Sequence, residues 1–328
     1  MKKQIYILIC LMLGCLILAV IGYNQYSIDL ENKKLQDLKS ETTDQPTSDI
    51  PSTTNQITIN CIGDDLTLGS TKTSYPSSLT SLTGYSTNKF GGAKDQTIDL
   101  SIRIGKTKVY AKNVTIPADV TSIPIKLYDS KEKELDVLKS SGSNFSTVEI
   151  DGIAGKLSYD SSSKQHTFTR TQKGDEKNIT SLTQITAQFP EFNTNDIAVI
   201  FTGTYDPYYQ DSIFKTMTYQ GEIISHLKTT KYIVVSLTSK RTFSIVDDMN
   251  KVLKEKYGDH YLDFRTYLLK NGLQDAGITP TDQDKKDIAN GYIPTSLLNS
   301  DKITGNEKFN SLLTKQIIQK MKDLKYID

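Results

Sequence analysis

The segment CIGDDLTLGS, Cys61 to Ser70, decides how the rest of the chain is interpreted. It completes the alternating run NQITIN, and this alternation of apolar and polar residues predicts a β-strand. The Gly, Asp and Thr residues that follow predict a turn at the end of the strand. Asp65 lies in this turn and is the first candidate site residue.

Downstream, strand-like and helix-like segments alternate. The runs DIAVIFTGTYD and KYIVVSLT have the pattern of buried strands, and SIVDDMNKVLKEKYG and EKFNSLLTKQIIQKMKDL have that of helices. This alternation predicts an α/β fold in which helices cover both faces of a central parallel sheet, giving three layers. Ligands of such sheets lie beyond the carboxyl ends of the strands. Asp65 and the segment Gly203–Asp206 both lie at such ends.

An all-β subdomain is expected inside this α/β domain. Between residues 105 and 180, short runs such as KVYAKNVTIPA and TVEIDGIAGKLSYD alternate with period two and are separated by Gly, Ser, Asp and Asn. The α/β domain is therefore expected in two parts, residues 57–104 and 181–328, with the β subdomain at 105–180.

The N-terminus predicts a membrane anchor. Residues 1–4 form a short positive leader, and Ile5–Tyr23 is a run of 19 residues without a charge, long enough to cross a bilayer as a helix. Lysines before the run place the leader in the cytoplasm and the bulk of this single-pass protein outside the cell. The sequence LGC, ending at Cys15, leaves a lipid-modified form as an alternative. Residues 24–56 are polar and contain prolines, which predicts a flexible stalk.

The amino-acid composition limits the classes of partner that the protein is expected to bind. The 39 basic and 38 acidic residues nearly cancel, and no basic stripe with interleaved aromatics indicates nucleic-acid binding. Cys61 is the single cysteine of the exported part, so no internal disulfide is expected, as is common in exported proteins of Gram-positive bacteria.

The acidic run TDQDKKD lacks the glycine and closing glutamate of a calcium loop and is interpreted as a helix N-terminus. We expect no metal and no cofactor.

Four segments resemble the conserved blocks of the SGNH (GDSL-type) hydrolase family. GDDLTLG is similar to the first block, NKFGGA to the second, GTYD to the third and SDKITGNEKFN to the fifth. The β insert and the long segment YGDHYLDFRTYLLKNGLQDAGITPTDQDKKDIANGYIPTSL resemble a membrane-anchored bacterial subgroup with an inserted β-domain, whose members act on or bind carbohydrate surfaces. The resemblance covers most of residues 57–328 and implies an SGNH-hydrolase-like fold.

The resemblance also implies site positions, and most of the catalytic ones are substituted. Family members use a serine nucleophile, a histidine base oriented by an aspartate, and an oxyanion hole that includes a glycine N–H and an asparagine. Here the serine position holds Asp65, the asparagine position holds Tyr205 and the histidine position holds Thr304, whereas the aspartate is kept as Asp301. The resemblance further implies binding roles for these residues: Gly91 or Gly92, Gly203 and Asp206.

Three functions stay open on this basis. The first is a pseudoenzyme that binds, or helps to process, cell-surface glycan or a peptidoglycan-linked polymer without family-type esterase activity. The second is an active esterase or deacetylase acting on cell-wall or capsular carbohydrate. The third is a changed hydrolase that uses carboxylates such as Asp65 and Asp301. The three histidines, His166, His226 and His260, are interpreted as structural, as is Asp64.

Overall fold

A computed structural model describes residues 57–69, 74–140, 145–189, 191–207, 212–240 and 245–328. The leader, anchor and stalk predicted for residues 1–56 lie outside the described residues. Among the residues that are described, no helix is long and apolar enough to cross a membrane. Residues 55–328 form one compact unit.

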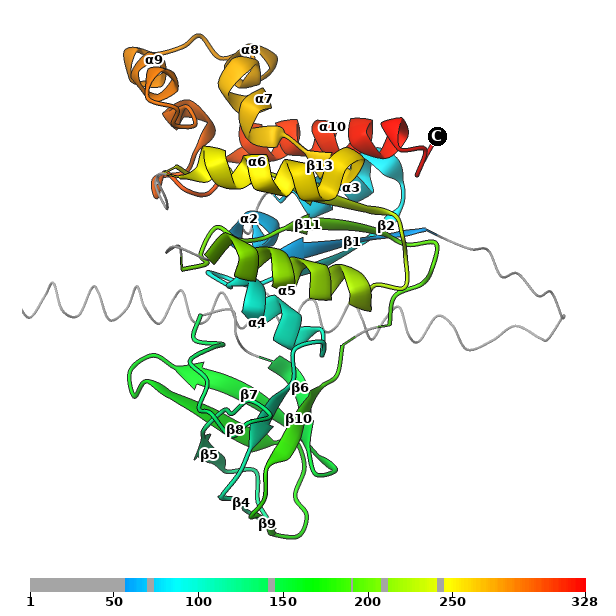
Figure 1. The fold of residues 1–328 in the computed structure, drawn as a ribbon, viewed down its shortest axis with the longest axis vertical. Coiled ribbons are helices and arrows are strands. Elements are labelled where there is room, and N and C mark those ends of the chain that lie inside the picture. The colour runs from blue at the N-terminus through cyan, green and yellow to red at the C-terminus, as the bar shows by residue number, and fades with distance from the viewer. Residues whose placement is uncertain (1–56, 70–73, 141–144, 190, 208–211, 241–244) are drawn as a thin grey trace, which may run out of the picture. The chain divides into compact units, whose positions relative to one another are not determined.

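The α/β part is built on a five-stranded sheet in which every neighbouring pair is parallel (Figure 1). Its strands, in spatial order, are β13 (Tyr261–Leu262), β12 (Tyr232–Val235), β11 (Ile197–Phe201), β1 (Thr58–Gly63) and β2 (Ser86–Gly91). The residues of β11 are all buried, as expected for a central strand covered on both faces. The mixed α/β fold with a parallel sheet predicted from the sequence is confirmed.

Helices cover both faces of this sheet, because successive strand residues point to opposite sides. One face packs against α3 (Tyr75–Thr83), α7 (Phe264–Lys270), α8 (Gly272–Asp275) and α10 (Glu307–Asp323). The other face packs against α4 (Thr97–Arg103), α5 (Ser212–His226) and α6 (Val246–Tyr257). The neighbours Cys61 and Ile62 of β1 belong to these two separate cores.

The remaining helices are short or peripheral. They are α2 (Asp65–Leu68), α9 (Asp282–Ala289) and the 3-10 turns Gly258–His260 and Thr295–Leu297. Helix α9 begins with a capping box between Thr281 and Asp284, and the carboxylate of Asp287 accepts hydrogen bonds from Thr295. The acidic run at residues 282–287 is therefore a helix N-terminus, as predicted.

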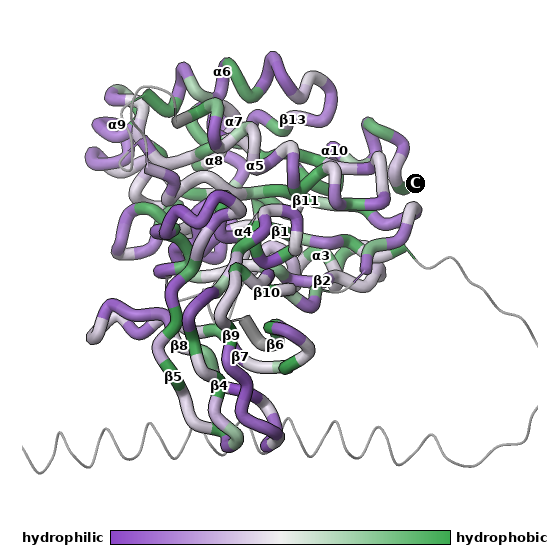
Figure 2. Tube along the Cα trace, turned by 60° about the horizontal axis from the view of Figure 1, so that its bottom comes forward, coloured by the Kyte–Doolittle hydropathy of each residue, from purple (hydrophilic) through white to green (hydrophobic). Residues whose placement is uncertain are grey.

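The β-rich part contains a six-stranded sheet and a two-stranded sheet. The larger one has the order β3 (Val109–Ala111), β10 (Thr183–Ala187), β6 (Phe145–Ile150), β7 (Ile153–Asp160), β8 (Gln165–Arg170), β5 (Ser122–Ile125). The smaller one pairs β4 (Val114–Ile116) with β9 (Lys177–Ile179). Hydrophobic and hydrophilic residues alternate along several of these strands (Figure 2), and the inward residues form a third core.

Strand β10 lies beyond residue 180, where the β insert was expected to end. It pairs with both β3 and β6, so the β-rich part extends to Ala187. The reason is that β10 brings the chain back beside β3, where the chain entered the insert. The insert also contacts the α/β part directly, since the N–H of Leu138 donates to the buried carboxylate of Asp99 in α4 (2.6 Å).

Candidate functional site

The order of the parallel strands creates one place where a ligand can enter. Numbered within this sheet, the order is 2-1-3-4-5, so the chain changes direction between β1 and β11. Loops leaving the carboxyl ends of two such strands diverge and leave a crevice between them. Asp65 follows β1, and the segment Gly203–Asp206 follows β11. The two sequence-predicted strand ends therefore meet at the switch point of the sheet.

Asp64 joins these two strand ends. Its side chain caps helix α2 by accepting from the N–H of Leu66 (3.0 Å), and it also accepts from the N–H of Thr204 (3.2 Å). Complete burial raises the pKa of Asp64 to about 7, although these hydrogen bonds act in the opposite direction. The structural role predicted for Asp64 thus corresponds to two backbone contacts that hold the next residue, Asp65, at the crevice.

Gly63 makes the close approach of these strands possible. A Cβ atom at this position would lie 2.2 Å from the carbonyl oxygen of Phe201 and 2.2 Å from the hydroxyl of Thr67. Both distances are far below van der Waals contact, so a larger residue would push β1 away from β11. Packing therefore requires a glycine at position 63, whether or not the site is catalytic.

Tyr205 lies close to Asp65 at the crevice. Burial, followed by the neighbouring carboxylates of Asp65, Asp64 and Asp301, raises the pKa of Tyr205 well above its ordinary value. Tyr205 is therefore neutral near pH 7, and its hydroxyl can donate a hydrogen bond.

Asp301 and Thr304 lie in a tight loop that closes on itself. One carboxylate oxygen of Asp301 accepts from the N–H groups of Ile303 (2.8 Å) and Thr304 (2.9 Å), and the other accepts from the Thr304 hydroxyl (2.7 Å). Partial burial acts to raise the pKa of Asp301, but these hydrogen bonds outweigh it and hold the pKa below its ordinary value. Asp301 is ionised near neutral pH, and Thr304 serves as its donor.

The turn of Asp65 and the loop of Asp301 and Thr304 line one cavity of about 220 Å³, and Tyr205 is not part of its lining. Its lining comprises Asp65, Leu66, Gly69, Asn299, Asp301, Thr304, Gly305 and Asn310. The pocket combines carboxylates with two amides and a hydroxyl, so it offers many acceptors and few cationic donors. This composition suits a neutral ligand that carries many hydroxyl groups, or a cationic ligand.

Sequence reasoning did not single out Asn299 and Asn310. The amide of Asn299 donates to the Thr304 hydroxyl (3.0 Å) and to the carbonyl of Gly305 (3.0 Å), and the amide of Asn310 also donates to Gly305 (3.2 Å). Asn299 lies two residues before Asp301, and this spacing of turn-forming side chains was the available signal.

The two glycines of the second block differ in their surroundings. Gly91 ends β2 opposite Gly63 of β1, and a Cβ atom there would lie 2.6 Å from the backbone nitrogen of Leu68. The N–H of Gly92 donates to the carbonyl of Gly63 (3.3 Å). The amide of Gly92 is therefore used inside the fold, Gly91 packs against the backbone of Leu68, and neither glycine lines the pocket of Asp65.

Asp206, expected in a binding role, has a structural one. It is half-buried, and its two carboxylate oxygens accept from the N–H of Thr97 (2.7 Å) and from the Thr216 hydroxyl. These contacts connect the loop after β11 to helices α4 and α5. Gly203, at φ +116, accepts from the N–H of Asp206 (3.3 Å), so it shapes the same turn. Both oxygens of Asp206 thus accept hydrogen bonds from neighbouring elements, and ligand binding by Asp206 stays a prediction.

All three histidines of the chain are among the described residues, and none lines the pocket of Asp65. His166 bonds to the carbonyl of Leu138 in the β-rich part (3.2 Å). His260 stacks on Tyr232, with the ring centroids 4.0 Å apart. His226 ends helix α5 and packs its ring edge against Phe192. Within the described chain, no group of three or more His, Cys, Asp or Glu residues is arranged to hold a metal ion.

Comparisons with known proteins find a similarity among solved structures. No protein-family model matches the chain, and no curated protein matches it. Among solved structures, the chain is similar to a GDSL-like lipase from Bacteroides thetaiotaomicron, with 10% sequence identity and a TM-score of 0.41. The match covers 89% of this chain and 98% of the lipase.

Proposed function

We propose that this chain is an SGNH-hydrolase-like protein that binds cell-surface glycan in the pocket of Asp65 and Asp301 without the family's esterase reaction. The observation that carries the proposal is the state of the catalytic positions. The serine position is a carboxylate close to Tyr205, and the histidine position is a threonine whose hydroxyl donates to Asp301. These segments are far apart in the sequence, yet they meet at the crevice where the family resemblance implies a site.

Each substitution removes one part of ester hydrolysis. A carboxylate at residue 65 repels the oxyanion that the family's site stabilises, and Thr304 has no basic nitrogen to accept a proton. Losing the serine or histidine of such a triad costs about 10⁶ in turnover, and losing one oxyanion donor costs about 10²–10³. Ester hydrolysis by the family mechanism is therefore not expected.

A polar pocket still binds ligand without a nucleophile. Ionised Asp301 and the amides of Asn299 and Asn310 line it together with Asp65. Carboxylate oxygens and amide oxygens accept hydrogen bonds from hydroxyl groups, so the lining complements a sugar. A polymer of the cell surface is the partner that fits a domain held outside the cell by the predicted anchor at Ile5–Tyr23.

A carboxylate-based glycosidase is a weaker candidate. That reaction needs one carboxylic acid with a raised pKa to protonate the leaving group. Asp301 has the opposite shift, because its own loop hydrogen-bonds to the ionised form. Asp301 is thus suited to accepting hydrogen bonds from a ligand and unsuited to donating a proton.

The test combines an esterase assay with substitutions that restore the family's catalytic residues. We expect the purified protein to show only background hydrolysis of aryl acetates and acetylated sugars. Asp65→Ser, Tyr205→Asn and Thr304→His together should restore weak esterase activity, whereas each single change should not. Glycan binding should weaken in Asp65→Ala. Esterase activity in the unmodified protein that Asp65→Ala abolishes would overturn the proposal and favour a changed or residual enzyme.

A further inference from the structure

The β-rich part contains a second cavity, larger than the one beside Asp65. Its volume is about 630 Å³, which lies within the range of roughly 300–1,000 Å³ typical of small-ligand sites. Four segments line it: residues 112–114 from the end of β3 to the start of β4, residues 124–128 at and after the end of β5, residues 134–135, and residues 164–166 at the start of β8. We call this cavity the insert groove.

The insert groove is basic. Lys112, Lys126 and Lys164 line it, against the single carboxylate of Glu134. Lys126 pairs with Glu134 (2.9 Å), and Lys112 pairs with Glu132 outside the lining (2.7 Å). The two glutamate side chains are 61% and 56% exposed, so water competes with both ion pairs and each contributes little. An incoming anion can therefore take over these lysines at small cost.

The same groove offers surfaces for a sugar ring. The Nζ of Lys112 lies over the ring of Tyr128, 4.7 Å from the ring centroid. Leu135 adds a partly exposed apolar side chain to the lining, whereas Ile125 and Leu127, which also border the groove, are buried. An aromatic ring with apolar neighbours binds the C–H face of a saccharide, while the amides of the lining bind its hydroxyl groups. Those amides belong to Asn113 and Gln165.

We propose that the insert groove binds an anionic saccharide chain through Lys112, Lys126 and Lys164, with Tyr128 as the stacking surface. The positive charge of the insert groove favours an anionic ligand. The pocket of Asp65 and Asp301, in contrast, carries two carboxylates and repels anions. The chain thus has two sites of opposite charge. The insert groove takes acidic groups of a polymer, and the pocket of Asp65 takes neutral or cationic groups. The insert groove stands independently of the function proposed for Asp65.

The experiment measures binding of defined oligomers to the full chain in detergent by isothermal titration calorimetry. A galacturonate oligomer presents carboxylates, a poly(glycerol phosphate) oligomer presents phosphates, and a cello-oligosaccharide presents neither. We expect at least one anionic oligomer to bind, with affinity that falls as salt is added, and the neutral oligomer to bind at least tenfold more weakly. The stronger anionic oligomer identifies the acidic group.

Matched variants locate the site. Lys126→Glu with Lys164→Glu should weaken anionic binding about tenfold or more, since two attractions become repulsions. Lys156→Glu with Lys173→Glu changes the net charge equally on exposed residues of the same part outside the groove, and should change affinity less than about twofold. Asp65→Asn should leave this binding intact. Thermal unfolding confirms that each variant is folded.

Four results would overturn the proposal. The first is absence of binding by both anionic oligomers. The second is an equal loss in both double variants, which would mean that net charge alone attracts the ligand. The third is tighter binding of single-stranded nucleic acid through the same lysines. Loss of binding in Asp65→Asn would instead assign the anion to the other pocket and also reject the insert groove.

Discussion

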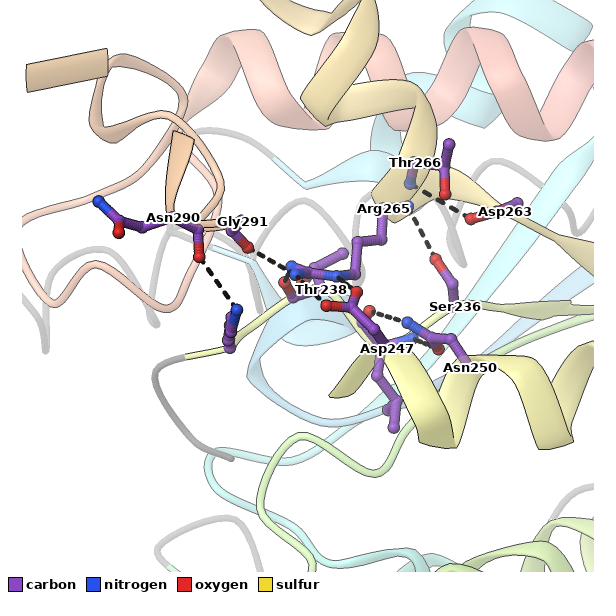
Figure 3. A network of polar contacts seen from close by, with 11 residues as sticks. Ser236, Thr238, Asp247, Asn250, Asp263, Arg265, Thr266, Asn290 and Gly291 are labelled. Atoms are coloured by element: carbon purple, nitrogen blue, oxygen red, sulfur yellow. Dashed lines mark hydrogen bonds and ion pairs between the residues drawn. The ribbon is translucent and has the colours of Figure 1, made fainter. Parts of the chain in front are cut away.

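Arg265 holds together loops at the carboxyl edge of the sheet (Figure 3). Its side chain is buried, at 2% exposure, and it donates to the carbonyls of Thr238 (2.6 Å) and Gly291 (2.5 Å) and to the carboxylate of Asp247 (2.8 Å). Its backbone N–H donates to the hydroxyl of Ser236 (2.8 Å). One guanidinium thus joins the loop after β12, helix α6 and the end of helix α9.

The contacts of Arg265 differ in strength, and this difference gives a sharp prediction. Hydrogen bonds from a charged donor to the two carbonyls contribute about 1.5–3 kcal/mol each. The ion pair contributes about 0–1 kcal/mol, because the Asp247 side chain is 63% exposed. Arg265→Met keeps most of the volume and removes all donors, so it should lower the free energy of unfolding by about 3–6 kcal/mol. Asp247→Asn should lower it by less than about 1 kcal/mol.

Urea unfolding followed by far-UV circular dichroism measures both changes. Lys228→Met is the matched control, since it removes a cation from an exposed pair with Glu191 and should cost less than about 1 kcal/mol. A loss below about 1 kcal/mol in Arg265→Met would refute the role assigned to the carbonyl contacts. Equal losses in Arg265→Met and Asp247→Asn would show that the ion pair holds the loops.

Two further predictions concern pH and topology. Burial raises the pKa of Asp64 to about 7 and that of Asp99 to about 6, above 3.8, so the folded state binds protons more tightly and the free energy of unfolding should rise as pH falls from 7 towards 5. The lowered pKa of Asp301 acts oppositely: its contribution is present above 3.8 and is lost as pH falls through the folded-state value, so stability should decline again in stronger acid. Urea titrations across this range test both, and a steady rise in stability up to pH 8 would contradict the buried-aspartate effect. For topology, an external protease on intact cells should remove the mass from about Gln56 onward and leave a stub containing Ile5–Tyr23, whereas protection until the membrane is opened would reverse the orientation.

Local sequence patterns were enough to predict several helices and strands. The alternation in NQITIN and the buried run Ile197–Phe201 predicted strands that the structure contains, and the acidic run at residues 282–287 predicted a helix N-terminus that it also contains. These features are encoded within a few residues, because side-chain periodicity and capping hydrogen bonds act over one or two turns of chain.

Long-range packing determines which residues lie together and which side chains hydrogen-bond to other elements of the fold. Only the strand order brings the loop of Asp301 and Thr304 to the same pocket as Asp65, more than 200 residues earlier in the chain. Asp206 matched a family motif by position, yet its oxygens are taken by Thr97 and Thr216 from two helices. Strand β10 was left outside the insert because its partner β3 lies about 70 residues away. Such pairings depend on long-range packing, and a local pattern contains no information about the group that will lie opposite a side chain.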